Sequence, residues 1–127
     1  NARAARVAAQ MQRALEALLR RGVKDPRVGN ATVTRLTMSP DLSVARVHVL
    51  PFASSDARAG EQLLAGLRSA GGYLRGQLAR ELKLRHAPQL EFELDQDLEQ
   101  AVVRVLAAIR VMGERVQRGD VRGDERL

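Results

Sequence analysis

The chain has 127 residues, of which 45% are apolar and only 2% aromatic, so it is long enough for one compact domain with an aliphatic core. It contains no cysteine, which excludes disulfides, thiolate zinc ligands and cysteine nucleophiles, and no apolar run approaches the roughly 20 residues of a membrane-spanning helix. With 21 basic against 15 acidic residues the net charge is +6, which favours a polyanionic partner, nucleic acid ahead of an anionic membrane surface.

The first half of the chain predicts a helix followed by a β-hairpin. Residues 3–20 carry apolar side chains on one stripe at helical spacing, which predicts an amphipathic helix that ends near Gly22. Residues 31–38 are rich in β-branched types and predict a strand. A second strand is predicted at residues 44–50, where apolar and polar residues alternate and leave His48 on a solvent-exposed face.

Two further helices are predicted on either side of an adjacent pair of glycines. The sequence SSD at residues 54–56 offers helix caps, and leucines at helical spacing follow it. The leucine spacing resumes after Gly71 and Gly72 and continues to about Lys83. Two glycines inside one helix would destabilise it by roughly 2 kcal/mol relative to alanine, so the chain either turns here or bends for a functional reason.

The sequence closes with one more strand and one more helix. Residues 89–95 alternate cleanly between apolar and polar types and predict a strand, after which Asp97 is expected to cap the last helix. From about Gly113 the sequence is polar and has no apolar stripe, so we expect one domain at residues 1–112 and a flexible tail at residues 113–127. The α-β-β-α-α-β order with a C-terminal helix predicts an α+β fold, with the helices on one face of a small mixed sheet.

Basic residues form two groups that are candidates for contacting nucleic acid. The first group recurs every seventh residue on the first helix, nearly opposite its apolar stripe, and the second lies around and after the glycine pair. A solvated helix face is the alternative for both groups, and the net charge tips the choice toward contact with RNA phosphate. The groups are Arg6, Arg13 and Arg20, and Arg68, Arg75, Arg80, Lys83 and Arg85.

Nothing in the sequence predicts catalysis or a metal site. Asp95, Asp97 and Glu99 lie close together, but a helix cap with acids in the first turn explains them through the helix dipole. His48 and His86 have no helically spaced ligand beside them, so we expect both at the protein surface. The chain also lacks the glycine-rich phosphate loop of nucleotide hydrolases and a Ser-His-Asp signature. We therefore expect no enzyme, no metal and no cofactor.

Aromatic platforms for stacking bases are scarce. Phe92 falls on the apolar face of its strand, which leaves Tyr73 as the only plausible platform. We therefore expect recognition of folded RNA through its backbone and shape, and not base by base.

Two long stretches resemble a known family. The stretches VKDPRVGNATVTRLTMSPDLSVARVHV and LRSAGGYLRGQLARELKLRHAPQLEFELD are similar to ribosome-binding factor A, a bacterial small-subunit assembly factor, and the resemblance covers residues 3–109. It implies a type II KH fold in which an Ala-x-Gly kink, here Ala70-Gly71-Gly72, replaces the GXXG loop that ordinary KH domains use to grip single-stranded nucleic acid. Gly72 fits this pattern, and we expect it to permit the bend and a close approach of RNA; Gly71 occupies the variable middle position.

The resemblance also implies a function and partners. A member of this family would bind the immature 30S small ribosomal subunit, assist maturation of the ends of 16S rRNA, work alongside other assembly factors and be removed by a GTPase. We expect a cytoplasmic monomer that binds no membrane and that holds one rRNA conformation through differential affinity. The expected RNA-binding residues are the two basic groups together with the Ala70-Gly71-Gly72 kink. A general KH-like module for mRNA or small RNA stays open as an alternative, with an RNA nuclease far behind.

Overall fold

The computed structural model describes residues 2–29, 31–51 and 57–117. The chain divides into two units, residues 1–95 and 96–127, and each is described by itself. The elements of the first unit, in chain order, are α1 (Ala2–Arg21), β1 (Thr32–Met38), β2 (Val44–Leu50), α2 (Ala57–Ser69), α3 (Gly71–Glu81) and β3 (Gln89–Leu94). The second unit contains α4 (Gln96–Gln117). The caps expected at residues 54–56 lie outside the described residues.

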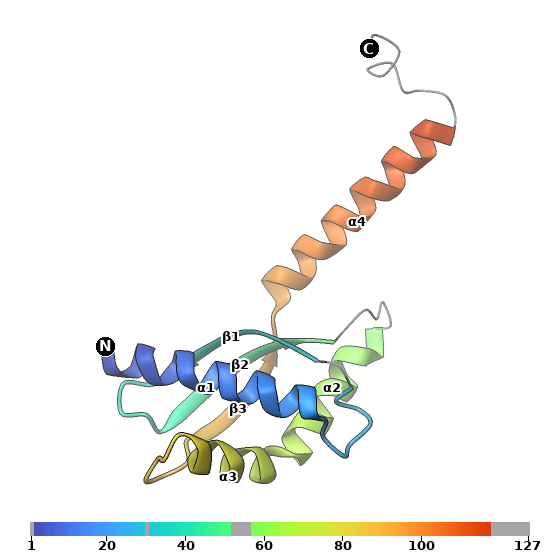
Figure 1. Ribbon diagram of the computed structural model, residues 1–127. Coiled ribbons are helices and arrows are strands. Elements are labelled where there is room, and N and C mark those ends of the chain that lie inside the picture. Colours follow the sequence, from blue (N-terminus) through green and yellow to red (C-terminus); the bar gives the residue numbers. More distant parts are fainter. Residues whose placement is uncertain (1, 30, 52–56, 118–127) are drawn as a thin grey trace. The chain divides into compact units, whose positions relative to one another are not determined.

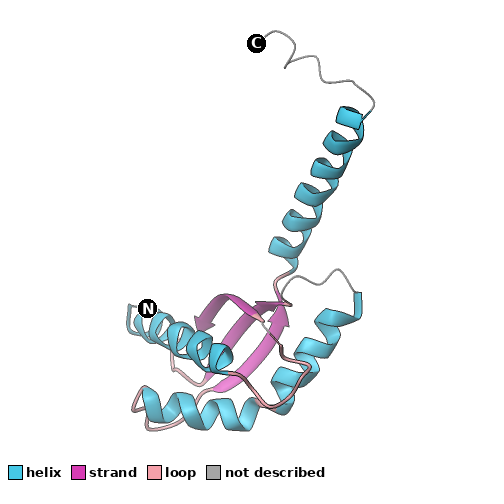
Figure 2. Ribbon diagram, turned by 45° about the vertical axis from the view of Figure 1, so that its right-hand side comes forward, coloured by secondary structure: helices cyan, strands magenta, loops and turns pink. Residues whose placement is uncertain are grey.

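The first unit is a three-stranded sheet with three helices on one face (Figures 1 and 2). The strand order is β1-β2-β3; β1 pairs antiparallel with β2, and β2 pairs parallel with β3. A parallel neighbour requires a long crossover, and α2 and α3 supply it between β2 and β3. The α-β-β-α-α-β order and the one-sided helical layer agree with the fold expected from the sequence.

A β-bulge interrupts the alternation of buried and exposed side chains along β1. Val33 and Leu36 are both buried although they are three residues apart, a spacing that would place them on opposite faces of a regular strand. The register shifts between Val33 and Arg35, so that Thr34 is the extra residue opposite β2. The bulge turns both apolar side chains toward the helices.

The core is aliphatic, as the composition predicts. β2 lies at its centre because it is the middle strand, and Ala45, Val47 and Val49 on its helix-facing side are fully buried. Among the described residues, Phe92 of β3 is the one aromatic side chain in the core cluster. The helices contribute the largest fully buried side chains, namely Met11, Leu15, Leu63, Leu67, Leu74 and Leu78.

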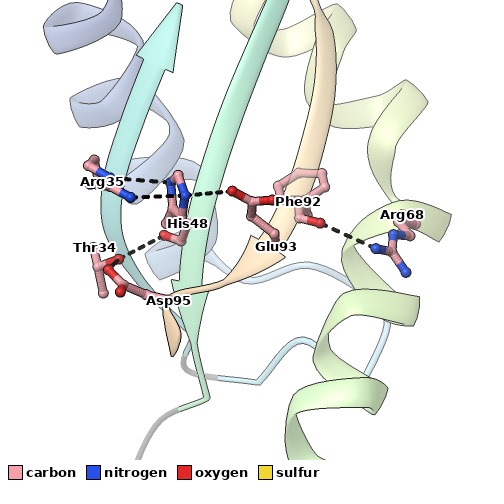
Figure 3. A network of polar contacts seen from close by, with 7 residues as sticks. All are labelled: Thr34, Arg35, His48, Arg68, Phe92, Glu93 and Asp95. Atoms are coloured by element: carbon pink, nitrogen blue, oxygen red, sulfur yellow. Dashed lines mark hydrogen bonds and ion pairs between the residues drawn. The ribbon is translucent and has the colours of Figure 1, made fainter. Parts of the chain in front are cut away.

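His48 is buried, in contrast to the surface position that the sequence predicts. It does point to the helix-free face of the sheet, but its exposed fraction is only 8% because long polar side chains on both neighbouring strands cover it (Figure 3). Arg35 Nη2 lies 3.1 Å from His48 Nε2, and Glu93 Oε1 lies 2.6 Å from the same nitrogen. The strand pairing sets both neighbours directly opposite His48, so this face carries a cross-strand polar ladder.

Helix α4 differs from its expected bounds at both ends. It begins at Gln96, so Asp97 lies within the first turn of the helix and does not cap it. It continues through Gly113 to Gln117 and is therefore longer than predicted, because one interior glycine costs only about 1 kcal/mol relative to alanine. The remaining part of the expected tail, residues 118–127, lies outside the described residues. No helix in the described part of the chain is long and apolar enough to cross a bilayer.

The turn after α1 offers a pH-dependent prediction. The Asp25 carboxylate accepts hydrogen bonds from the backbone N–H and from Nε of Arg27, each at 2.9 Å, and these bonds lower its pKa from 3.8 to about 2. A lowered pKa stabilises the fold above the unfolded-state value, and the contribution is lost as the pH falls toward the folded value. Asp25→Asn should therefore lower the urea midpoint of unfolding at neutral pH. This gap between the midpoints of the wild type and the variant should close between about pH 4 and pH 2. A gap that persists at pH 2 would contradict the assignment.

Candidate RNA-binding surface

The kink between α2 and α3 is one residue wide. Ala70 alone separates the two helices, with φ −84° and ψ 0°. Its N–H donates to the Gly66 carbonyl at 3.0 Å, and its carbonyl accepts from the Leu74 N–H at 3.0 Å, so helical hydrogen bonds continue on both sides of the bend. These torsions lie in the bridge region, which residues other than glycine can adopt.

The two glycines do not create the bend. Neither Gly71 nor Gly72 has a positive φ, whereas Gly22 and Gly29 do. The expectation that Gly72 permits the bend is therefore wrong, because the change of direction is made at Ala70. A Cβ atom added to either Gly71 or Gly72 would meet nothing within 4 Å, so the glycines leave the surface at the start of α3 open.

The first turn of α3 is a potential anion-binding site. The first N–H groups of any helix lack intrahelical acceptors, and no side chain caps this helix at Ala70. Because the helix dipole is positive at this end, a phosphate oxygen is a suitable acceptor. The open surface over Gly71 and Gly72 gives a phosphate group room to approach.

Two arginines predicted to contact RNA have partners within the fold. Arg68 Nη2 donates to the Phe92 carbonyl at 3.3 Å (Figure 3). Arg75 Nε donates to the Pro88 carbonyl at 2.9 Å, and its Nη2 donates to the Ala87 carbonyl at 3.1 Å. These bonds tie α2 and α3 to β3 and to the loop before it. Each guanidinium has five donors, so both side chains keep donors for a further partner.

The other basic residues of this group lie toward the far end of α3. Its 11 residues span about 16 Å from the kink. Arg80 lies in the last turn, and Lys83 and Arg85 follow in the loop; all three are exposed. Arg85 lines a pocket of about 200 Å³ together with Arg3 from α1 and His86. The sequence did not pair Arg3 with Arg85, because their proximity depends on how α1 packs against the loop after α3.

The basic residues of α1 are accessible. Arg6, Arg13 and Arg20 are all exposed, because residues seven apart return to nearly the same side of a helix, here the side away from the buried stripe. Arg21 forms an ion pair of 2.9 Å with Glu81 and so links α1 to α3. The structure thus puts the first predicted group on α1, and the second on α2, on α3 and in the loop after α3. Among the described residues, no three histidine, aspartate or glutamate side chains lie close enough to hold a metal ion.

The kink between α2 and α3 is the feature that the resemblance had implied, and the comparisons with known proteins agree with the resemblance. The family model of ribosome-binding factor A matches residues 3–105. The chain belongs to the ribosome-binding factor A family. The ribosome-binding factor A of Pseudomonas fluorescens Pf-5 is 39% identical over 123 residues, which cover 97% of this chain and 92% of the relative. That of Brevibacillus brevis is 40% identical over 115 residues, which cover 89% and 93%.

Solved structures of this family share the fold. The crystal structure of ribosome-binding factor A from Thermus thermophilus aligns with a TM-score of 0.61 and 34% identity, over 72% of this chain and 94% of that one. A homology model of the Thermus thermophilus factor, fitted into a cryo-electron microscopy map of its complex with the 30S subunit, aligns with a TM-score of 0.56 and 34% identity, over 69% of this chain and 90% of that one. These findings confirm the family resemblance and the type II KH-like fold.

Proposed function

We propose that this chain is a non-catalytic assembly factor that binds the 30S ribosomal subunit and assists late maturation of 16S rRNA. The observation that carries the proposal is its family membership, together with the related Thermus thermophilus factor that was fitted into a map of a 30S complex. The factor acts in the cytoplasm as a monomer, beside other small-subunit assembly factors, and a GTPase releases it from the finished subunit.

The kink and the basic residues support this function physically. The N–H groups at the start of α3 bind one rRNA phosphate, and Gly71 and Gly72 leave room for it. The exposed arginines of α1 and the basic residues at the end of α3 bind further phosphates. The complete proposed contact set is Arg6, Arg13, Arg20, Arg68, Ala70, Gly71, Gly72, Arg75, Arg80, Lys83 and Arg85.

The mechanism needs no chemical step. A protein that binds one rRNA conformation more tightly than another shifts the population toward the first by its difference in binding free energy. Holding the immature subunit in that conformation lets the processing enzymes act on it. Release then requires a partner that lowers the affinity for the mature subunit.

Co-sedimentation with ribosomal particles over a salt series tests the proposal. We expect the full chain to pellet with free or immature 30S subunits and not with large subunits or assembled ribosomes. Equal binding to every particle, lost at modest salt, would show nonspecific charge attraction only. Preference for free oligonucleotides over subunits would favour a general KH-like RNA-binding module, and cleavage of precursor rRNA by the purified protein would reveal a nuclease.

Arg13 provides a prediction for the basic group on α1. Its side chain is exposed, so Arg13→Ala should leave the fold intact and remove one phosphate contact. The slope of log K against log salt for 30S binding should fall by roughly 0.7–0.9. An unchanged slope would show that Arg13 makes no phosphate contact.

Lys83 provides a prediction in which stability and affinity move in opposite directions. It ends α3 with a φ of 54°, and the N–H of Leu84 donates to the Ala79 carbonyl at 2.9 Å, a helix ending that normally carries glycine. Lys83→Gly should therefore raise the free energy of unfolding by about 0.5–1 kcal/mol. The same change should reduce the salt slope of 30S binding. Loss of stability would contradict the strained backbone at this position.

A further inference from the structure

Tyr73 is an unusual side chain on the surface of the first unit. Its exposed fraction is 56%, and among the described residues up to Asp95 it is the one large hydrophobic side chain that is exposed. The next residue, Leu74, is fully buried, so α3 is firmly packed beside the exposed ring. An aromatic ring held in solvent by a rigid helix is the platform on which bases of single-stranded nucleic acid stack.

The Tyr73 ring lines a groove of about 440 Å³, named here the Tyr73 groove. One wall is the loop of residues 22–25 after α1, and the other is formed by Ser69, Ala70 and Tyr73 at the kink. The loop turns sharply at Gly22, whose φ of 96° requires glycine. The lining is mostly apolar, which suits a flat ring better than a phosphate group.

The charges around the Tyr73 groove favour a nucleotide. Lys24 adds a positive charge to the loop wall. The single acid in the lining, Asp25, is paired with Arg27, whose Nε lies 2.9 Å from its carboxylate, so this acid does not repel an anion as a lone carboxylate would. Ala70, which directly precedes the first turn of α3, also lines the groove, so a phosphate bound at that turn would lie close to the ring.

We propose that the Tyr73 groove binds one unpaired RNA nucleobase, stacked on the Tyr73 ring. This proposal deepens the proposed function and rests on it, since it identifies a single-stranded nucleotide within the rRNA site as the ligand. It also changes the mode of recognition expected from the sequence. The protein recognises the RNA backbone and shape and, in addition, one base. The phosphate contacts at the kink position this base against the Tyr73 ring.

The composition of the chain makes a direct test possible. Tyr73 is the only tyrosine and there is no tryptophan, so intrinsic emission reports on this one ring. The probes are a short oligoadenylate and an abasic ribose-phosphate oligomer of the same length, which carries the same charge. We expect oligoadenylate to quench the Tyr73 emission, and the abasic oligomer to bind about 5- to 150-fold more weakly and to leave the emission unchanged.

Two variants read the same contact from the protein side. Tyr73→Ala should weaken oligoadenylate binding by the same factor and abolish the preference over the abasic oligomer, whereas Tyr73→Phe keeps the ring and should keep both. Equal affinity for the two oligomers in the wild type would overturn the proposal. The proposal would also be overturned if Tyr73→Ala lost 30S binding while oligoadenylate and the abasic oligomer bound equally well. That result would indicate that the groove binds a protein segment of the subunit. Wild-type co-sedimentation with 30S subunits separates these outcomes from failure of the proposed function itself.

Discussion

Leu67→Ala is expected to lower the free energy of unfolding by about 2–5 kcal/mol. Leu67 lies in the last turns of α2, immediately before the kink, and its side chain is 0% exposed. Truncation removes the transfer free energy of the buried methyl groups and leaves a cavity that a sheet-backed core cannot fully close. Urea unfolding followed by far-UV circular dichroism measures the loss.

Leu67→Met is the matched control for this prediction. It keeps nearly the same side-chain volume, so its cost should stay below about 1.5 kcal/mol. If both variants lost the same stability, the effect would not come from the cavity. The inference that Leu67 is tightly packed in the core would then be wrong. A loss of this size in the alanine variant should also lower the melting temperature by several degrees for each kcal/mol, since the first unit is small.

The regular elements were predictable because each is encoded by a local pattern. The strand at residues 44–50 was predicted at the bounds that the structure has, since its alternation spans the whole segment. The first helix was predicted to within one residue at each end, because its apolar stripe at helical spacing spans nearly the whole segment. The kink was also visible in the sequence, but its geometry was not. Adjacent glycines indicated the bend, whereas the structure makes it at Ala70 and uses the glycines to keep the surface open.

Features that depend on two segments at once were not predictable. The bulge at Thr34 exists only relative to the register of β2. His48 is buried because Arg35 and Glu93 on separate strands flank it, although its own strand pattern indicates a solvent-exposed face. The same holds for the candidate site. Arg68 was predicted as a phosphate contact from its position beside the glycines, and its bond to the Phe92 carbonyl requires the packing of α2 against β3.

Two glycines near the kink should respond to the same substitution in opposite ways. Gly66 is buried, and a Cβ atom there would lie 3.0 Å from Arg27 Cβ and 3.0 Å from Val28 Cγ2. Gly66→Val should therefore destabilise the fold by about 1–3 kcal/mol through overpacking against the loop before β1. Gly72→Val meets nothing within 4 Å at its Cβ, so its free energy of unfolding should stay within about 0.5 kcal/mol of the wild type.

Affinity for the 30S subunit should show the reverse order. Valine at position 72 covers the first turn of α3 and keeps a phosphate from its N–H groups, so the affinity should fall about tenfold or more, as the loss of a hydrogen bond to a charged group predicts. Gly66→Val, measured at a temperature where it is folded, should bind nearly as well as the wild type because its added atoms face the loop of Arg27 and Val28. If Gly72→Val lost stability and affinity together, the open surface at the kink would serve the fold alone, and the phosphate site would have to lie with the basic residues of α1 and of the far end of α3.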